Sequence, residues 1–204
     1  MRDASERDLG VHLETALRGV VIGERWPKSG CEVVITVLEG EEDGWWGDRR
    51  GGEKGGGWGM MSVLAGCITV ASAALVNAGI DCVDLVSGGV AALIRHAEGE
   101  GSQVVIDPSP CEHDMKAACV VGYLQSRDEV TETWIKGDAG GELEAMVDQA
   151  VKAASMTRTV LAEALKEAAE QKAGSFAEEV KTQNCHADVS GKGKERQRDV
   201  VMTG

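Results

Sequence analysis

The stretch CVDLVSGGVAALIR, residues 82–95, decides how the middle of the chain folds. Apolar and β-branched residues on both sides of Ser87-Gly88-Gly89 are typical of strands, and a Ser-Gly-Gly cluster is typical of a turn. The sequence therefore predicts two strands joined at this tripeptide. A polar turn follows, and the apolar run QVVID at 103–107 predicts a further strand.

Downstream of this stretch, the pattern of apolar residues changes from strands to a helix. The segments KAACVVGYL (116–124) and EVTETWIKG (129–137) are predicted to form a hairpin. Apolar residues then recur at steps of three and four over 141–172, which predicts a long amphipathic helix. Residues 173–204 are polar and are predicted to form a disordered tail.

Upstream, helical and strand patterns alternate around a Gly-rich interruption. An amphipathic helix is predicted at 4–22 and a buried strand at 31–39, where the sequence is CEVVITVLE. The charged, Gly-rich residues 40–58 lack any period and are predicted to form a long loop or insertion. The order of helices and strands along the chain predicts a single α/β domain.

Residues 59–80 form an uncharged run of a length that also fits a membrane span, and a helix is predicted within it at 60–78. The run is rich in Ala, Ser, Thr, Gly and Cys, and no basic cluster flanks it. A helix that is apolar all round can equally lie buried against a sheet. We therefore predict a buried helix here and no membrane association.

The bulk composition narrows the classes of function. The chain has 204 residues, 43% of them hydrophobic, and a formal net charge of −13. Phosphate contacts need Lys and Arg, so such an acidic chain is not a self-sufficient nucleic-acid binder, although it could touch RNA locally. The 6 cysteines form no Cys-x-x-Cys pair, which predicts free thiols in a reducing compartment, and the N-terminus does not resemble a signal peptide.

A polar cluster lies between the strand at 103–107 and the next predicted strand. Asp107, Glu112, His113 and Asp114, with Cys111 beside them, are residue types that could bind Mg²⁺ or Zn²⁺. The alternative is a polar loop before a strand, shaped by its two prolines. The spacing matches no zinc pattern, so we favour the polar loop and predict no metal site.

Four segments together resemble proteins of the RNase PH fold. They are SERDLGVHLETAL (5–17), PKSGCEVVITVLE (27–39) with SVLAGCITVASAALVNAGI (62–80), DLVSGGVAALI (84–94) and IDPSPCEHDMKAACVVGYLQSRDEVTETWIKGD (106–138). The resemblance implies an α/β, RNase PH-like (ribosomal protein S5 domain 2-like) sandwich of mixed sheet and helices over 3–172. Family members begin with several strands before the Ser-Glu-Arg helix, so it also implies an N-terminally truncated version.

The same resemblance implies that the family's active-site positions have degenerated. Active relatives carry an Arg before the first helix, where this chain has Ala4. Their phosphate-binding turn at the central helix matches Ser62 and Val63, and a valine cannot hold phosphate. The short motif that carries the catalytic aspartates in active relatives matches the strand around Ala118 and Cys119, where no aspartate remains. The resemblance therefore implies a protein without catalytic residues, cofactor or metal.

Among RNase PH-like proteins, the chain is most similar to the non-catalytic ring subunits of the eukaryotic RNA exosome. This implies scaffolding and RNA channelling in 3′-to-5′ RNA processing and degradation, including ribosomal RNA maturation and messenger RNA turnover. The implied partners are other RNase PH-like subunits in a six-membered ring, S1/KH-type cap proteins and RNA, with Arg2 and Arg7 as RNA contacts. The implied location is the nucleus and nucleolus, and also the cytoplasm.

Two alternatives stay open at this point. The chain could be an active phosphate-dependent 3′-to-5′ exoribonuclease of the same family, if residues elsewhere compensate for the lost positions. It could also be an unrelated soluble α/β protein. Phosphate-dependent loss of RNA 3′ ends would favour the first alternative, and failure to associate with RNase PH-like partners would favour the second.

Overall fold

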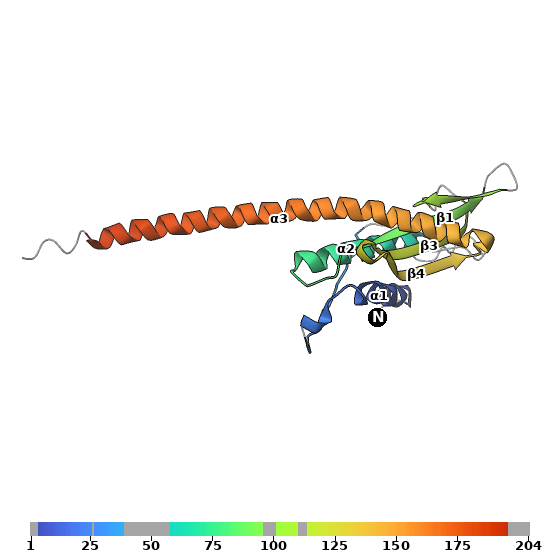
Figure 1. Ribbon diagram of the computed structural model, residues 1–204, viewed down its shortest axis with the longest axis horizontal. Coiled ribbons are helices and arrows are strands. Elements are labelled where there is room, and N and C mark those ends of the chain that lie inside the picture. Colours follow the sequence, from blue (N-terminus) through green and yellow to red (C-terminus); the bar gives the residue numbers. More distant parts are fainter. Residues whose placement is uncertain (1–3, 26, 39–57, 96–100, 110–113, 196–204) are drawn as a thin grey trace, which may run out of the picture. The chain divides into compact units, whose positions relative to one another are not determined.

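A computed structural model describes residues 4–25, 27–38, 58–95, 101–109 and 114–195 of the chain (Figure 1). Most of the predicted insertion at 40–58 and the last nine residues of the predicted tail lie outside the described residues. The chain divides into two units, residues 1–162 and residues 163–204. The first unit contains the sheet.

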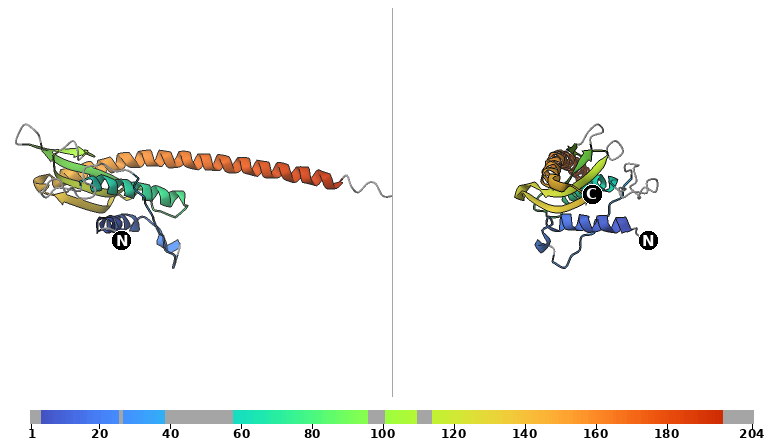
Figure 2. Two further views of the ribbon diagram at one scale, coloured as in Figure 1. Left: turned by 180° about the vertical axis from the view of Figure 1, so that it is seen from behind. Right: turned by 90° about the vertical axis from the view of Figure 1, so that its right-hand side faces the viewer.

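The first unit is a three-layer arrangement around one antiparallel sheet (Figures 1 and 2). The strands lie in the order β2-β1-β3-β4, with β1 at Val86–Arg95, β2 at Ser102–Ile106, β3 at Met115–Leu124 and β4 at Glu129–Gly137. Helices α1 (Ala4–Arg18) and α2 (Gly59–Asn77) cover one face, and the beginning of α3 (Leu143–Glu195) covers the other. The predicted α/β fold class is confirmed.

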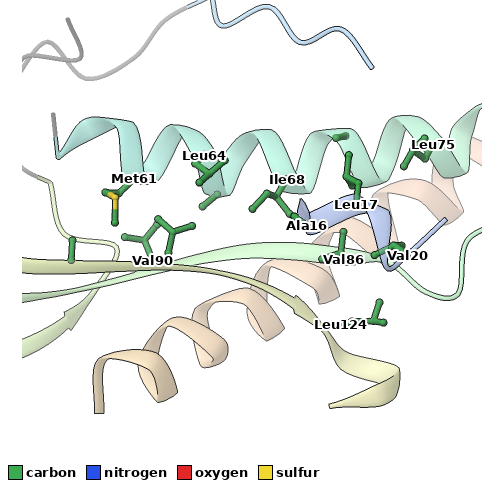
Figure 3. Close-up of a cluster of buried hydrophobic side chains, with 14 of the residues drawn as sticks. Ala16, Leu17, Val20, Met61, Leu64, Ile68, Leu75, Val86, Val90 and Leu124 are labelled. Carbon is green, nitrogen blue, oxygen red and sulfur yellow. The ribbon is translucent and has the colours of Figure 1, made fainter. Parts of the chain in front are cut away.

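The larger of two core clusters lies between α1, α2 and the sheet. Figure 3 shows side chains of α2 pointing down onto β1, with the end of α1 beside them. Aliphatic residues dominate this cluster, as the shortage of aromatic residues in the sequence requires. Its fully buried members include Ala16, Val20, Met61, Leu64, Ile68, Val86 and Leu124.

Two adjacent glycines let helices pack closely on both faces of β1. A Cβ atom on Gly88 would lie 2.6 Å from the Ala65 carbonyl carbon of α2, and one on Gly89 would lie 2.5 Å from the Ala154 backbone nitrogen of α3. Both residues lie within the single strand β1, so the predicted turn at Ser87-Gly88-Gly89 is wrong. Glycine is needed here for close approach of neighbouring backbone rather than for a turn.

Buried hydroxyl groups connect β1 to the helices on both sides. The Ser87 hydroxyl donates to the Ala154 carbonyl oxygen of α3 at 2.8 Å. The Val86 N–H donates to the Ser72 hydroxyl of α2 at 3.0 Å. Because buried polar groups are costly unless they are paired, these bonds fix where each helix crosses the strand.

The predicted hairpin is confirmed as β3 and β4, which pair antiparallel from Ala117 with Gly137 to Leu124 with Glu129. The connecting turn places Asp128 in the left-handed region, at φ 51°. Its carboxylate accepts a hydrogen bond of 2.6 Å from the Tyr123 hydroxyl. Asp adopts this backbone region more readily than most residues, and the hydrogen bond to Tyr123 stabilises the turn.

Helix α2 is buried on one face only. The face with Met61, Leu64, Ile68 and Leu75 packs in the core. The sequence predicts that the whole helix is buried, but Val70 on another face is 58% exposed. By length and composition, α2 is the one helix among the described residues that could cross a membrane, and 44% of its apolar window is buried in the fold. Packing in the core therefore explains part of the apolar character of this helix.

Residues 31–38 form no strand, so the buried strand predicted at 31–39 is wrong for the part that the structure describes. Val33 and Ile35 pack partly against the core, whereas Val34 is 79% and Leu38 94% exposed. Neither edge of the sheet pairs with this segment. A β-prone sequence needs a neighbouring strand to satisfy its backbone, and the described residues supply none here.

The helix α3 is described as far as Glu195, whereas a disordered tail is predicted from residue 173. The part of α3 that belongs to the second unit begins at residue 163. Its described side chains, at 163–175, are mostly exposed. These residues are mainly Ala, Glu, Lys and Gln, which have high helix propensity. Extending an existing helix costs less than nucleating one, which explains why the helix passes the predicted end.

The described cysteines differ sharply in their expected reactivity. Cys119 is buried in β3 and burial raises the pKa of its thiol to about 11, whereas Cys31 is exposed. Because the thiolate is the reactive form, we expect a thiol reagent at about pH 8 to label Cys31 but not Cys119 in the folded protein. Peptide mass spectrometry locates the label, and both should react in denaturant. Fast labelling of Cys119 in the native protein would contradict the packing of β3.

Candidate functional site

Two residues that the sequence analysis named for separate reasons meet at the beginning of α2. The Ser62 hydroxyl donates to Asp107 Oδ1 at 3.4 Å, although 45 residues separate them in sequence. Asp107 follows β2 with φ 44°, and its N–H donates to the Val90 carbonyl oxygen at 3.1 Å. No residue of α2 carries a charge. A carboxylate beside this part of the helix repels phosphate, and no side chain of α2 offsets that repulsion.

The predicted positions in β3 do not join Ser62 and Asp107 in one site. Ala118 belongs to the cluster under α1 and α2, whereas Cys119 belongs to the cluster under α3. Consecutive strand residues point to opposite faces, which separates them by the thickness of the sheet. Both are fully buried. An alanine has no ionisable group, and a buried thiol with a raised pKa is a poor proton donor.

The N-terminal positions lie on or before α1. Ala4 is the first residue of that helix. Arg7 is exposed on it, and Arg2 lies outside the described residues. An exposed guanidinium can contact an RNA phosphate. The assignment of Arg2 and Arg7 as RNA contacts stays a prediction.

The polar cluster after β2 supplies no metal site from its described side chains. Asp114 is exposed and its carboxylate lies 3.6 Å from the Arg95 guanidinium. Glu112 and His113 lie outside the described residues. Within the described part of the chain, no three His, Cys, Asp or Glu side chains gather in a way that could hold an ion.

A polar and aromatic cluster between α1 and β4 was not predicted from the sequence. His12 Nδ1 lies 2.9 Å from Glu132 Oε1, and the imidazole stacks on Trp134 with ring centroids 4.8 Å apart. Further along β4, the Lys136 ammonium lies 5.2 Å from the centre of the Trp58 ring. Burial lowers the pKa of Lys136. The alternation of Glu132, Trp134 and Lys136 along the strand is the only sequence signal for this cluster.

This cluster has a structural role that follows from its contacts. Residues of one face of β4 bind α1 through His12 and the beginning of α2 through Trp58. Aromatic stacking and cation–π contacts of this kind each contribute on the order of 1 kcal/mol. The cluster therefore holds the two helices to the edge strand of the sheet.

Two curated proteins are similar to this chain. Exosome complex component MTR3 of Chaetomium thermophilum is 48% identical over 172 residues, which cover 82% of this chain and 59% of that protein. Exosome complex component mtr3 of Schizosaccharomyces pombe is 27% identical over 169 residues, which cover 81% of this chain and 58% of that protein. The chain thus spans less than two thirds of the length of either relative. No protein-family model matches the chain.

The α/β fold and this similarity define the class of protein: the chain has an RNase PH-like fold. Within that class, the chain is similar to the MTR3 components of the exosome from two fungi. The resemblance to exosome ring subunits, found from the four sequence segments, is confirmed.

Proposed function

We propose that this chain is a non-catalytic structural subunit of an RNA exosome ring. In this role it scaffolds the complex and helps to channel RNA for 3′-to-5′ processing and degradation, including ribosomal RNA maturation and messenger RNA turnover. One observation carries the proposal: the chain is 48% identical to a protein named Exosome complex component MTR3. The domain of 3–172 is the part proposed to enter the ring.

The proposed partners are other RNase PH-like subunits in a six-membered ring, S1/KH-type cap proteins and RNA. The net charge of −13 is compatible with this role, because a scaffold can rely on basic surfaces of its partners to hold RNA. Arg2 and Arg7 are the proposed RNA contacts of this chain. The proposed location is the nucleus and nucleolus, and also the cytoplasm.

The absence of catalysis by this chain is supported by the residues at the beginning of α2. Val63 cannot bind phosphate, and the Asp107 carboxylate beside Ser62 disfavours an anion there. Phosphorolysis needs cationic side chains to hold the attacking phosphate. An active phosphate-dependent exoribonuclease of the same family is the alternative that this geometry disfavours.

A phosphorolysis assay tests this part of the proposal. The purified chain is incubated with single-stranded RNA, with and without inorganic phosphate, and nucleoside diphosphates are measured. We expect no phosphate-dependent product from the chain alone, because the beginning of α2 offers no cationic side chain to hold the attacking phosphate. Asp107→Ala is the matched control for contaminating nuclease. Product that requires phosphate and disappears in D107A would overturn the proposal.

A further inference from the structure

A histidine of α1 and a carboxylate of β4 form a largely buried pair. His12 Nδ1 lies 2.9 Å from Glu132 Oε1, and the Glu132 side chain is only 9% exposed. A carboxylate shielded from water is costly unless hydrogen bonds and an opposite charge compensate for it. Neutral imidazole can donate one hydrogen bond to this carboxylate, but only protonated imidazole also supplies the opposite charge.

The second neighbour of the imidazole also favours its protonated form. The His12 ring stacks on the Trp134 indole with centroids 4.8 Å apart and planes inclined by 21°. The face of an indole attracts a cation more strongly than a neutral ring. Glu132 and Trp134 therefore both bind the imidazole of His12 more tightly when it carries a proton.

Other charged groups are few in the elements that pack against α1. Helix α2 carries no charged residue, and Lys116 at the beginning of β3 is the one charged residue of that strand. On α1 itself, Asp8 lies one turn before His12 and is exposed. The charged residues of β4 are Glu129, Glu132 and Lys136, and the ammonium of Lys136 lies over the Trp58 ring. The carboxylate in hydrogen-bond contact, that of Glu132, is therefore the charge with the strongest effect on the imidazole.

The place of His12 along α1 gives this pair control over the beginning of the helix. Ala16 and Leu17 near the end of α1 are buried in the core. Residues 7–11, in the turns before His12, are exposed except for the half-buried Leu9. The end of α1 is thus held by packing, while the contacts of His12 lie close to its less buried beginning.

We propose that His12 is a pH-sensitive contact, which holds α1 to β4 more firmly when its imidazole is protonated than when it is neutral. Histidine changes its charge between about pH 5 and 8, where a carboxylate normally stays ionised. The beginning of α1 should therefore open more often in mildly basic than in mildly acidic solution. This proposal does not rest on the proposed function of the chain.

Hydrogen exchange of the full chain tests the proposal. Exchange of α1 amides is measured by mass spectrometry at pH 5.5 and 7.5, and each rate is divided by that of an unstructured peptide at the same pH. This gives a protection factor at each pH. His12→Gln keeps an N–H donor but cannot be protonated, so its ratio of the two protection factors reports every other effect of pH. We expect the ratio in the parent to exceed that in H12Q by about tenfold, because a charge-assisted hydrogen bond is roughly twice as strong as a neutral one.

Two further variants assign the effect to this pair. Glu132→Gln keeps an acceptor for the imidazole but removes the charge, so its ratio should fall close to that of H12Q. Glu14→Gln removes an exposed charge from the same helix and should keep the ratio of the parent. If H12Q fails to fold, the comparison of E132Q with E14Q makes the same test.

Three results would overturn the proposal. Equal ratios in the parent, H12Q and E132Q would show that protonation of His12 does not affect the attachment of α1. A ratio in E132Q as large as in the parent would show that the Glu132 carboxylate does not bind the protonated ring. A parent ratio below that of H12Q would show that α1 is held more firmly by neutral imidazole.

Discussion

Replacing Gly89 with alanine is expected to lower the free energy of unfolding by about 3 kcal/mol, the upper range for overpacking a core. The new Cβ would lie 2.5 Å from the Ala154 backbone nitrogen, and the Ala150 carbonyl oxygen is also in its way. Backbone atoms of a helix cannot rotate aside as a side chain can. The beginning of α3 must therefore move off the sheet. Urea denaturation followed by circular dichroism measures the loss.

Gly66→Ala is the matched control for this substitution. Gly66 is exposed on α2, and nothing lies within 4 Å of a Cβ placed there. Alanine favours a helix interior over glycine by about 0.5–1 kcal/mol, so this variant should be slightly more stable than the parent. Equal stability of the G89A and G66A variants would contradict the close packing of α3 on β1.

Replacing Asp84 with asparagine is expected to lower the free energy of unfolding at neutral pH by about 2 kcal/mol, as for other partly buried ion pairs with hydrogen bonds. Arg158 Nη2 donates to both Asp84 oxygens, at 2.7 and 3.0 Å, and the Ser126 N–H donates at 3.1 Å. The two side chains are only 13% and 26% exposed. Asp84 thus ties α3 to the residues before β1 and to the turn after β3, and its loss leaves a half-buried guanidinium without its carboxylate.

The contribution of Asp84 should depend on pH in a defined direction. Burial alone would raise the pKa of Asp84, but hydrogen bonds from Arg158, Leu85 and Ser126 and the charge of Arg158 outweigh it, so the pKa is lowered from its usual 3.8. A lowered pKa stabilises the fold above the unfolded-state pKa, and this stabilisation is lost as the pH falls through the folded-state pKa. The stability difference between the parent and D84N should therefore be constant near neutral pH and shrink in acid.

The exposed pair of Glu14 and Arg18 on α1 provides the control for this experiment. Exposed pairs at helical spacing contribute only about 0.3–0.5 kcal/mol, so Glu14→Gln should change the stability little at any pH. A D84N variant that is no less stable than E14Q at neutral pH would contradict the role given to the Asp84–Arg158 pair.

Local sequence patterns predicted the helices and strands whose formation depends mainly on residues close to them in sequence. Helix α1 and the β3–β4 hairpin follow from the local spacing of apolar residues, and α2 follows from the length and lack of charge of its sequence. The glycines of β1 were mistaken for a turn, because a turn and a close helix contact require the same residue type. The segment 31–38 has the composition of a strand, but pairing depends on a partner that composition does not reveal.

The candidate site was harder to predict, because its contacts join residues far apart in sequence. Ser62 and Asp107 were both singled out, for separate reasons, but nothing in the sequence indicated that they meet. His12 and Glu132 are 120 residues apart and neither belongs to a motif. The resemblance to exosome subunits came from the order of four sequence segments rather than from any one site.

The central claim is that this chain works as a subunit of an exosome ring. The most direct test is to purify the tagged chain from the cells that produce it and to measure the stoichiometry of co-purifying proteins by mass spectrometry. We predict that other RNase PH-like subunits and S1/KH-type cap proteins are present in amounts equal to the tagged chain. A chain that purifies alone, or only with further copies of itself, would contradict the claim.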